Sequence, residues 1–129
     1  MKYVFYVAAG VALLFASCKP DPVEVPNTAV ITVNSPLEGQ VFEHGDTVFI
    51  QGNVVATGMM HGLDIHIHNE ATDSIFFDYA LPQHGSVYTF SEQCINTVTD
   101  TTYLMLHVEC ELDDNGNVGS KIVNIQFNP

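Results

Sequence analysis

The chain has 129 residues and carries fifteen Asp and Glu side chains against three lysines and no arginine, which gives a formal net charge of −12. Such a surface repels nucleic acid and offers no guanidinium groups to hold phosphates, so we expect no nucleic-acid partner and favour cations or cationic partners. With 47% hydrophobic residues, the chain is long enough for one domain around a single core.

The N-terminus predicts export. Lys2 is followed by an uncharged apolar run over residues 3–16, which is too short to span a bilayer comfortably and is followed by a small residue. Its end, LFASC at residues 14–18, resembles a bacterial lipoprotein signal, which is cut before a cysteine that becomes lipid-modified. The resemblance implies a signal peptide over residues 1–17 and an acylated, stably anchored Cys18. The alternative is an ordinary secretory signal with an incidental cysteine.

Residues 18–27 are expected to form a tether between the anchor and a folded domain. Pro20, Pro22 and Pro26 alternate with acidic residues, a pattern that excludes helix and sheet interior. By resemblance, Lys19 differs from the aspartate associated with retention at the inner membrane. We therefore expect the protein to be anchored in the outer membrane of the cell envelope, with its domain facing either the periplasm or the cell surface. The expected partners are the membrane, through Cys18, and an envelope protein.

Residues 28–129 are expected to form one all-β domain, a seven-stranded antiparallel immunoglobulin-like β-sandwich. Short strand-like segments follow one another between turn residues, and no segment shows a sustained helical period. Seven such strands in about a hundred residues are typical of this sandwich. The expected strands span residues 29–34, 47–55, 63–69, 74–80, 87–93, 102–112 and 121–127.

Two stretches add a family resemblance. NSPLEGQVFEHGDTVFIQGNV, residues 34–54, resembles the opening of many bacterial immunoglobulin-like domains, with Ser-Pro, a glycine, an aromatic residue and Gly-Asp before an alternating strand. IHIHNE and YLMLHVECELDDNGN resemble parts of uncharacterised bacterial surface lipoproteins that have histidines on comparable strands. These resemblances imply a fold far more than an activity.

Cys94 and Cys110 are the cysteines of the expected domain. In an exported chain a disulfide between them is the first expectation, and it would stabilise the domain by about 3 kcal/mol if unstrained. A buried pair of free thiols is the alternative, because the sequence gives no separation between the two Cα atoms.

The stretch GLDIHIHNE, residues 62–70, predicts a strand with His66 and His68 on one face and apolar side chains on the other. In an immunoglobulin-like sandwich the third and sixth expected strands are antiparallel neighbours. Alternation along the sixth strand puts His107 and Glu109 on the same face.

A register between these strands can also be predicted. If the start of the third strand pairs with the end of the sixth, His68 faces His107 and His66 faces Glu109. A His-x-His strand with a third histidine on its neighbour resembles the zinc-binding arrangement of the α-type carbonic anhydrases. Three neutral imidazoles suit zinc or copper, and Glu109 would be a ligand or would orient one.

Other interpretations of the histidines stay open. One alternative is that they are solvated residues on an ordinary outer face, since a register error of one residue would separate the four side chains. The other alternative is a pH-responsive interface. Met59, Met60 and His61 precede the histidine strand, and Met105 shares its face. Thioethers there would favour copper, whereas packing at the end of the sandwich is the competing interpretation.

The expected function is therefore binding and not catalysis. The sharper hypothesis is a lipid-anchored protein that binds zinc or copper through His66, His68, His107 and Glu109. The rival is a metal-free immunoglobulin-like module of interaction or surface assembly that binds a protein or glycan. A zinc hydrolase would need an enclosed pocket that nothing in the sequence supplies.

The stretch 113–117 predicts a hairpin turn, since it lacks the glycine and glutamate of a calcium loop.

Overall fold

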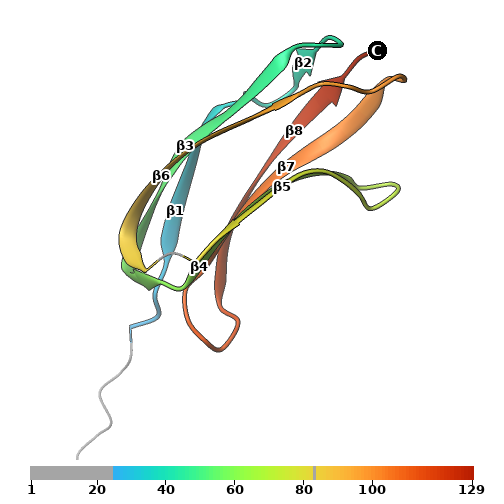
Figure 1. Ribbon diagram of the computed structural model, residues 1–129. Coiled ribbons are helices and arrows are strands. Elements are labelled where there is room, and N and C mark those ends of the chain that lie inside the picture. Colours follow the sequence, from blue (N-terminus) through green and yellow to red (C-terminus); the bar gives the residue numbers. More distant parts are fainter. Residues whose placement is uncertain (1–24, 83) are drawn as a thin grey trace, which may run out of the picture.

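The computed structural model describes residues 25–82 and 84–129, and the expected signal peptide and Cys18 lie outside them. The described chain is an immunoglobulin-like β-sandwich of two facing sheets (Figure 1). Its strands are β1 (Ala29–Ser35), β2 (Gln40–Phe42), β3 (Thr47–Met60), β4 (Gly62–Asn69), β5 (Ser74–Leu81), β6 (Gly85–Ile95), β7 (Thr102–Glu111) and β8 (Val118–Phe127). In the described part of the chain, no helix is long and apolar enough to cross a membrane.

The two sheets differ in size, and each is formed by strands from separate parts of the chain. One has three strands in the order β1-β3-β6, and the other has five in the order β2-β8-β7-β4-β5. The third and sixth expected strands are β4 and β7, and they pair antiparallel as predicted. The stretch 113–117 forms the predicted hairpin between β7 and β8, closed by a hydrogen bond from the Leu112 N–H to the Asn117 carbonyl (2.8 Å).

The prediction of seven antiparallel strands is wrong in one respect. An eighth strand, β2, has three residues and pairs parallel with the end of β8, where Phe42 lies opposite Phe127. Gly39, at a φ of 74°, provides the left-handed turn that leads into β2. A strand of three residues is too short to show the alternation from which the other strands were predicted.

The core lies between the sheets and is formed by the inward positions of alternating strands. Phe90 on β6 packs across Gly52 on β3, its register partner, and a Cβ at Gly52 would collide with the Phe90 ring and with the Thr32 carbonyl. The largest fully buried side chains are Phe90, Phe127, Ile50, Met60, Leu63, Ile65, Ile67 and Leu106. All of the buried core residues of the described chain lie from Phe42 to Phe127.

Asn96, just after β6, is a fully buried polar side chain. Its amide donates to the carbonyls of Phe42 (3.0 Å) and Asn128 (2.8 Å), and its Oδ1 accepts from the Val98 N–H (3.0 Å). The backbone of Asn96 also bonds to Gly45 and Asp46. One side chain thus ties β2, the C-terminus and the β6–β7 connection together at one end of the sandwich.

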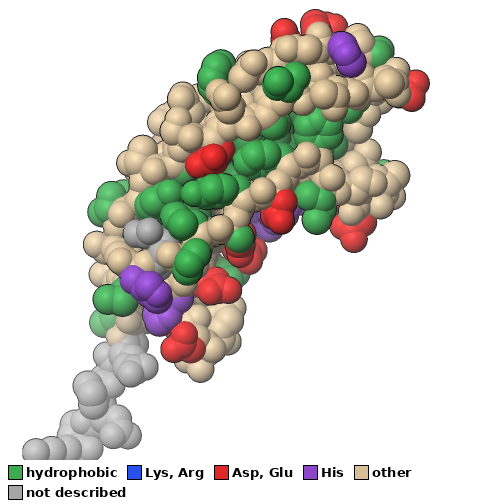
Figure 2. Space-filling model, viewed as in Figure 1, with side chains coloured by type: hydrophobic (Ala, Val, Ile, Leu, Met, Phe, Trp, Pro, Cys, Tyr) green, Lys and Arg blue, Asp and Glu red, His purple; other side chains and the backbone are tan. Residues whose placement is uncertain are grey.

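The edge strands β5 and β6 close one side of the sandwich with partly buried aromatic side chains, among them Phe76, Tyr79 and Tyr88. Phe76 meets the Phe127 ring edge-on at 5.0 Å between centroids. Glu92 on β6 alternates with the core residue Phe90 and so points inward at this edge. Figure 2 shows hydrophobic side chains in a band between the two layers, on a surface that otherwise carries scattered acidic groups.

Candidate histidine site on the outer face of the larger sheet

The outer face of the five-stranded sheet places three histidines together on β4 and β7. His66 lies directly opposite His107 on one side and opposite Asp78 of β5 on the other. His68, two residues along β4, lies opposite Met105. His66 is therefore at the centre of the group, because strand pairing gives it a neighbour on each side and alternation gives it His68 on the same face.

The imidazole rings are close to one another. The ring centroid of His66 is 4.9 Å from that of His107 and 5.0 Å from that of His68. Glu109 Oε2 lies 3.8 Å from His107 Nε2. Burial lowers the pKa of His66, and the neighbouring His107 and His68 lower it further, against the opposing effect of Asp78 and Glu109. The neutral imidazole, which is the form that binds metals, is thus favoured at the centre of the group.

The predicted register is wrong by two residues, although the predicted face is right. His107 pairs with His66 and not with His68, and Glu109 pairs with Asp64 and not with His66. A shift of two keeps every side chain on its own face, whereas a shift of one would have moved the histidines into the core. Glu109 consequently lies beside His107 at the margin of the group.

One buried atom of this group has no partner. His68 Nδ1 is buried, and no hydrogen-bond partner for it occurs among the described residues. A shallow pocket of about 160 Å³ lies beside this histidine and is lined by His66, His68, Asp73, Ile75 and Asp78. A buried ring nitrogen without a partner is destabilising by about 1–3 kcal/mol unless an ion, a water or a ligand satisfies it.

The group is not a preformed metal centre. Within residues 25–82 and 84–129, no three His, Cys, Asp or Glu side chains are arranged so that they already hold a metal ion. The backbone positions of His66, His68 and His107 are set by the β4–β7 ladder, so binding would require rotation of side chains and no change of strand register.

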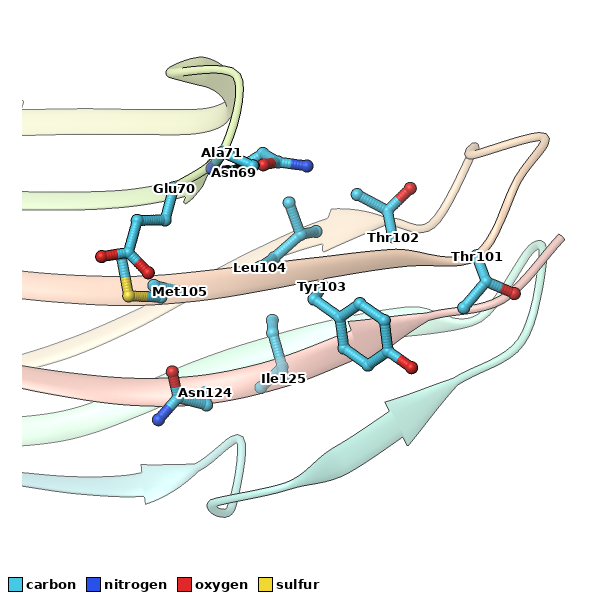
Figure 3. Close-up of a pocket in the computed structure, with 10 residues that line it drawn as sticks. All are labelled: Asn69, Glu70, Ala71, Thr101, Thr102, Tyr103, Leu104, Met105, Asn124 and Ile125. Atoms are coloured by element: carbon cyan, nitrogen blue, oxygen red, sulfur yellow. Dashed lines mark hydrogen bonds between the residues drawn. The ribbon is translucent and has the colours of Figure 1, made fainter.

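A larger pocket adjoins the histidine group at Met105. It has a volume of about 400 Å³ and lies between the start of the β4–β5 turn and the first half of β7 (Figure 3). Tyr103 lies on the opposite side of the β7 strand from Leu104 and is 71% exposed. The lining residues come from the turn, from β7 and from β8: Asn69, Glu70, Ala71, Thr101, Thr102, Tyr103, Leu104, Met105, Asn124 and Ile125.

The two cysteines do not form the predicted disulfide and are free thiols in the structure. Cys94 lies near the end of β6 in the smaller sheet, whereas Cys110 lies near the end of β7 in the larger one. The chain leaves β6 and enters β7 at the same end of the sandwich, which is the end where Cys94 lies. Cys110 lies about 26 Å along β7 from its first residue, Thr102, by the rise per residue of a strand. That separation is far beyond the Cα distance that a disulfide tolerates.

The methionines before β4 do not join the histidine face. Met60 is fully buried in the core and Met59 is 59% exposed. Packing at the end of the sandwich therefore accounts for Met60, as the competing interpretation held. Met105 is the methionine that lies beside the histidines, through its pairing with His68.

Sequence reasoning missed Asp78, which lies opposite His66, and Asp73 in the neighbouring pocket. A signal for Asp78 was present, since the short connection after β4 predicts a hairpin with the next strand. A bulge between Ile67 and His68 shifts the pairing near the turn, and its position is not visible in the alternation.

No family model matches the chain, and no curated protein matches it in sequence. Among solved structures, it is similar to a chain from the fibronectin(III)-like modules of Clostridium thermocellum CbhA. The sequence identity is 12% and the TM-score is 0.44, over 77% of this chain and 96% of that one.

Proposed function

We propose that this protein is a lipid-anchored binding protein of the bacterial cell envelope that holds zinc or copper on the outer face of its larger sheet. The ligands are His66, His68 and His107. Cys18 carries the lipid, and the outer membrane is the proposed location. The metal would be buffered there or passed to an envelope partner, and the protein would not act as an enzyme.

The observation that supports this proposal is the buried His68 Nδ1 without a partner, beside two further imidazoles whose centroids are about 5 Å from one another. Three solvated surface histidines would instead be expected to have their ring nitrogens in water. A metal ion would satisfy the ring nitrogen that the described chain leaves unpaired, and three imidazoles are a common set of ligands for zinc and copper.

A carboxylate next to the group would complete or orient it. Glu109 lies beside His107, and Asp78 lies opposite His66. Either would balance part of the charge of a divalent ion, and a carboxylate that accepts a hydrogen bond from a ligating imidazole fixes the orientation of its ring.

The test is titration of residues 21–129, which include all eight strands of the described chain, with zinc and with Cu(I) after treatment with a chelator. We expect stoichiometric, submicromolar binding. In His66→Ala or His107→Ala the affinity of this three-histidine group falls by more than about 100-fold, because even the loss of a group that only orients a ligand weakens binding 10- to 100-fold. Circular dichroism and the melting temperature of the free protein report whether each variant folds.

His44→Ala is the matched control. His44 lies in the turn between β2 and β3, and its Nδ1 lies 3.0 Å from the Val98 carbonyl. Its removal should leave the affinity of the three-histidine group unchanged. Weak binding of equal strength in the wild type, in His44→Ala and in His66→Ala would refute the metal proposal.

A metal-free module of interaction or surface assembly is the second candidate, and the pocket at Met105 favours it. Its volume is within the range of small-molecule sites, and Tyr103 offers an exposed aromatic face beside amide, hydroxyl and carboxylate groups. Such a lining suits a glycan or a polar peptide. Binding of a glycan or envelope protein that is lost in Tyr103→Ala, and unaffected by a chelator, would support this function.

A further inference from the structure

A second group of histidine and carboxylate side chains lies at the end of the sandwich where β1 begins. Figure 2 shows histidine side chains together at this end, and Figure 1 shows the β3–β4 corner and the β7–β8 turn beside each other there. The group consists of His61 in the corner after β3, His84 just before β6, and Asp114 in the β7–β8 turn. None of these three residues belongs to the sheet-face group around His66.

The strand pairing explains why the two histidines meet. Met60, the last residue of β3, pairs with Gly85, the first residue of β6. His61 and His84 are the next residue outward on each side, and their ring centroids lie 6.2 Å apart. The sequence alone offers no partner for His84, because it lies 23 positions after His61, with β4 and β5 between them.

The third side chain comes from the β7–β8 turn. Asp114 Oδ1 lies 3.0 Å from His61 Nδ1. Asp113 shapes this turn, because its Oδ1 accepts hydrogen bonds from the N–H groups of Asn115 (2.8 Å) and Asn117 (3.0 Å). Asp114 is 90% exposed, so its second oxygen remains open to a ligand.

The backbone beneath the group is held in place. The His61 N–H donates to the Glu111 carbonyl (2.9 Å), which joins the corner to the end of β7. The Asn27 side chain donates to the carbonyls of Met59 (2.8 Å) and Leu112 (3.0 Å). The two connections that carry His61 and Asp114 are therefore fixed relative to each other before any ligand binds.

We infer that His61, His84 and Asp114 form a second metal site, for a divalent transition-metal ion of the zinc type. Two imidazoles and one carboxylate are an established set of three protein ligands for zinc, with a fourth position left for water. The ion would join the β3–β4 corner, the segment before β6 and the β7–β8 turn. Formation of the site requires rotation of these side chains, since no preformed metal group occurs in the described chain.

The experiment isolates this site from the sheet-face group. The variant His66→Ala, His68→Ala of residues 21–129 is titrated with zinc, and the same titration is repeated after adding His61→Ala and His84→Ala. We expect one equivalent of zinc to bind the first variant and none to bind the fourfold variant. Asp114→Asn in the first background should weaken the remaining site about 10- to 100-fold, and Asn115→Ala should not.

The melting temperature supplies a second readout. Zinc should raise it in the His66→Ala, His68→Ala variant, and the rise should disappear when His84 is replaced, because binding to the folded state alone stabilises it. If His66→Ala, His68→Ala binds no zinc, or binds it equally well without His61 and His84, the second site is refuted and these side chains are a surface ion pair. If His66→Ala, His68→Ala removes no zinc while His61→Ala and His84→Ala do, the sheet-face proposal fails and the second site stands.

Discussion

His66 and His107 lie directly opposite each other on β4 and β7, and their ring centroids are 4.9 Å apart. Asp78 lies on the other side of His66, so Asp78 and Glu109 occupy different positions relative to the three histidines. Asp78 lines the same pocket as His66 and His68, whereas Glu109 lies beside His107 alone.

Asp78→Asn should therefore weaken zinc binding by about 10- to 100-fold, and Glu109→Gln should weaken it less. Both changes preserve the shape of the side chain and remove its charge. The measurement is competition with a chromogenic zinc chelator at constant pH and salt. A larger effect of Glu109→Gln would instead support the ligand set predicted from the sequence.

The substitution Met105→Leu should distinguish a copper site from a zinc site. The thioether of Met105 lies opposite His68, and soft sulfur ligands favour Cu(I) while contributing little to zinc. We expect the substitution to reduce Cu(I) affinity by roughly tenfold or more and to leave zinc affinity unchanged, since leucine has nearly the same volume. Equal Cu(I) affinities in both proteins would mean that the thioether is not a ligand.

Asn96→Ala should destabilise the sandwich. It removes three side-chain hydrogen bonds and leaves the Val98 N–H without its partner, while the Phe42 carbonyl keeps only its bond from the Asn128 N–H. We expect the free energy of unfolding to fall by about 2–4 kcal/mol in urea. Asn34→Ala, at an exposed position of β1, is the control and should change it by less than about 0.5 kcal/mol. Similar stabilities for the two variants would contradict the role given to Asn96.

Cys94 and Cys110 should both be titratable as free thiols once the domain is unfolded without reductant, and a mass lower by two hydrogens would contradict this. Burial raises the pKa of Cys94 to about 11 from 9.0, and burial also raises the pKa of Cys110. In the folded protein these thiols should react slowly with iodoacetamide at neutral pH, since the thiolate is the nucleophile.

The same shift makes stability depend on alkaline pH. Because the pKa of Cys94 is higher in the folded state than in the unfolded state, its contribution to stability is complete below pH 9 and is lost as the pH rises towards 11. Urea unfolding of Cys94→Ser should show a shallower decline across this range than the wild type. Parallel declines would mean that Cys94 does not titrate differently in the two states.

The sequence predicts the face of the histidines better than it predicts their partners. Alternation puts His66, His68 and His107 on one side of the sheet, and the structure confirms that β4 and β7 are neighbours. Register depends on where each strand begins and on the hairpins that join them, and a shift of two residues leaves the alternation unchanged. The residue opposite His66 therefore could not be identified from the pattern.

Other features depend on contacts between distant segments. The meeting of His61 and His84 follows from the pairing of β3 with β6, and the separation of Cys94 from Cys110 follows from the sheet to which each strand belongs. No local pattern around these residues carries that information. The strand β2 was missed for a different reason, since its three residues are too few to alternate.

Glu92 has a consequence for neighbouring copies of this domain at high concentration. β6 is an eleven-residue edge strand, and its free backbone groups are a template on which the β6 of another molecule could pair. Such a pairing would confine two Glu92 carboxylates within the continuous seam between the joined sandwiches, and the burial of unpaired like charges opposes it. Glu92 thereby disfavours edge-to-edge pairing of these domains through β6.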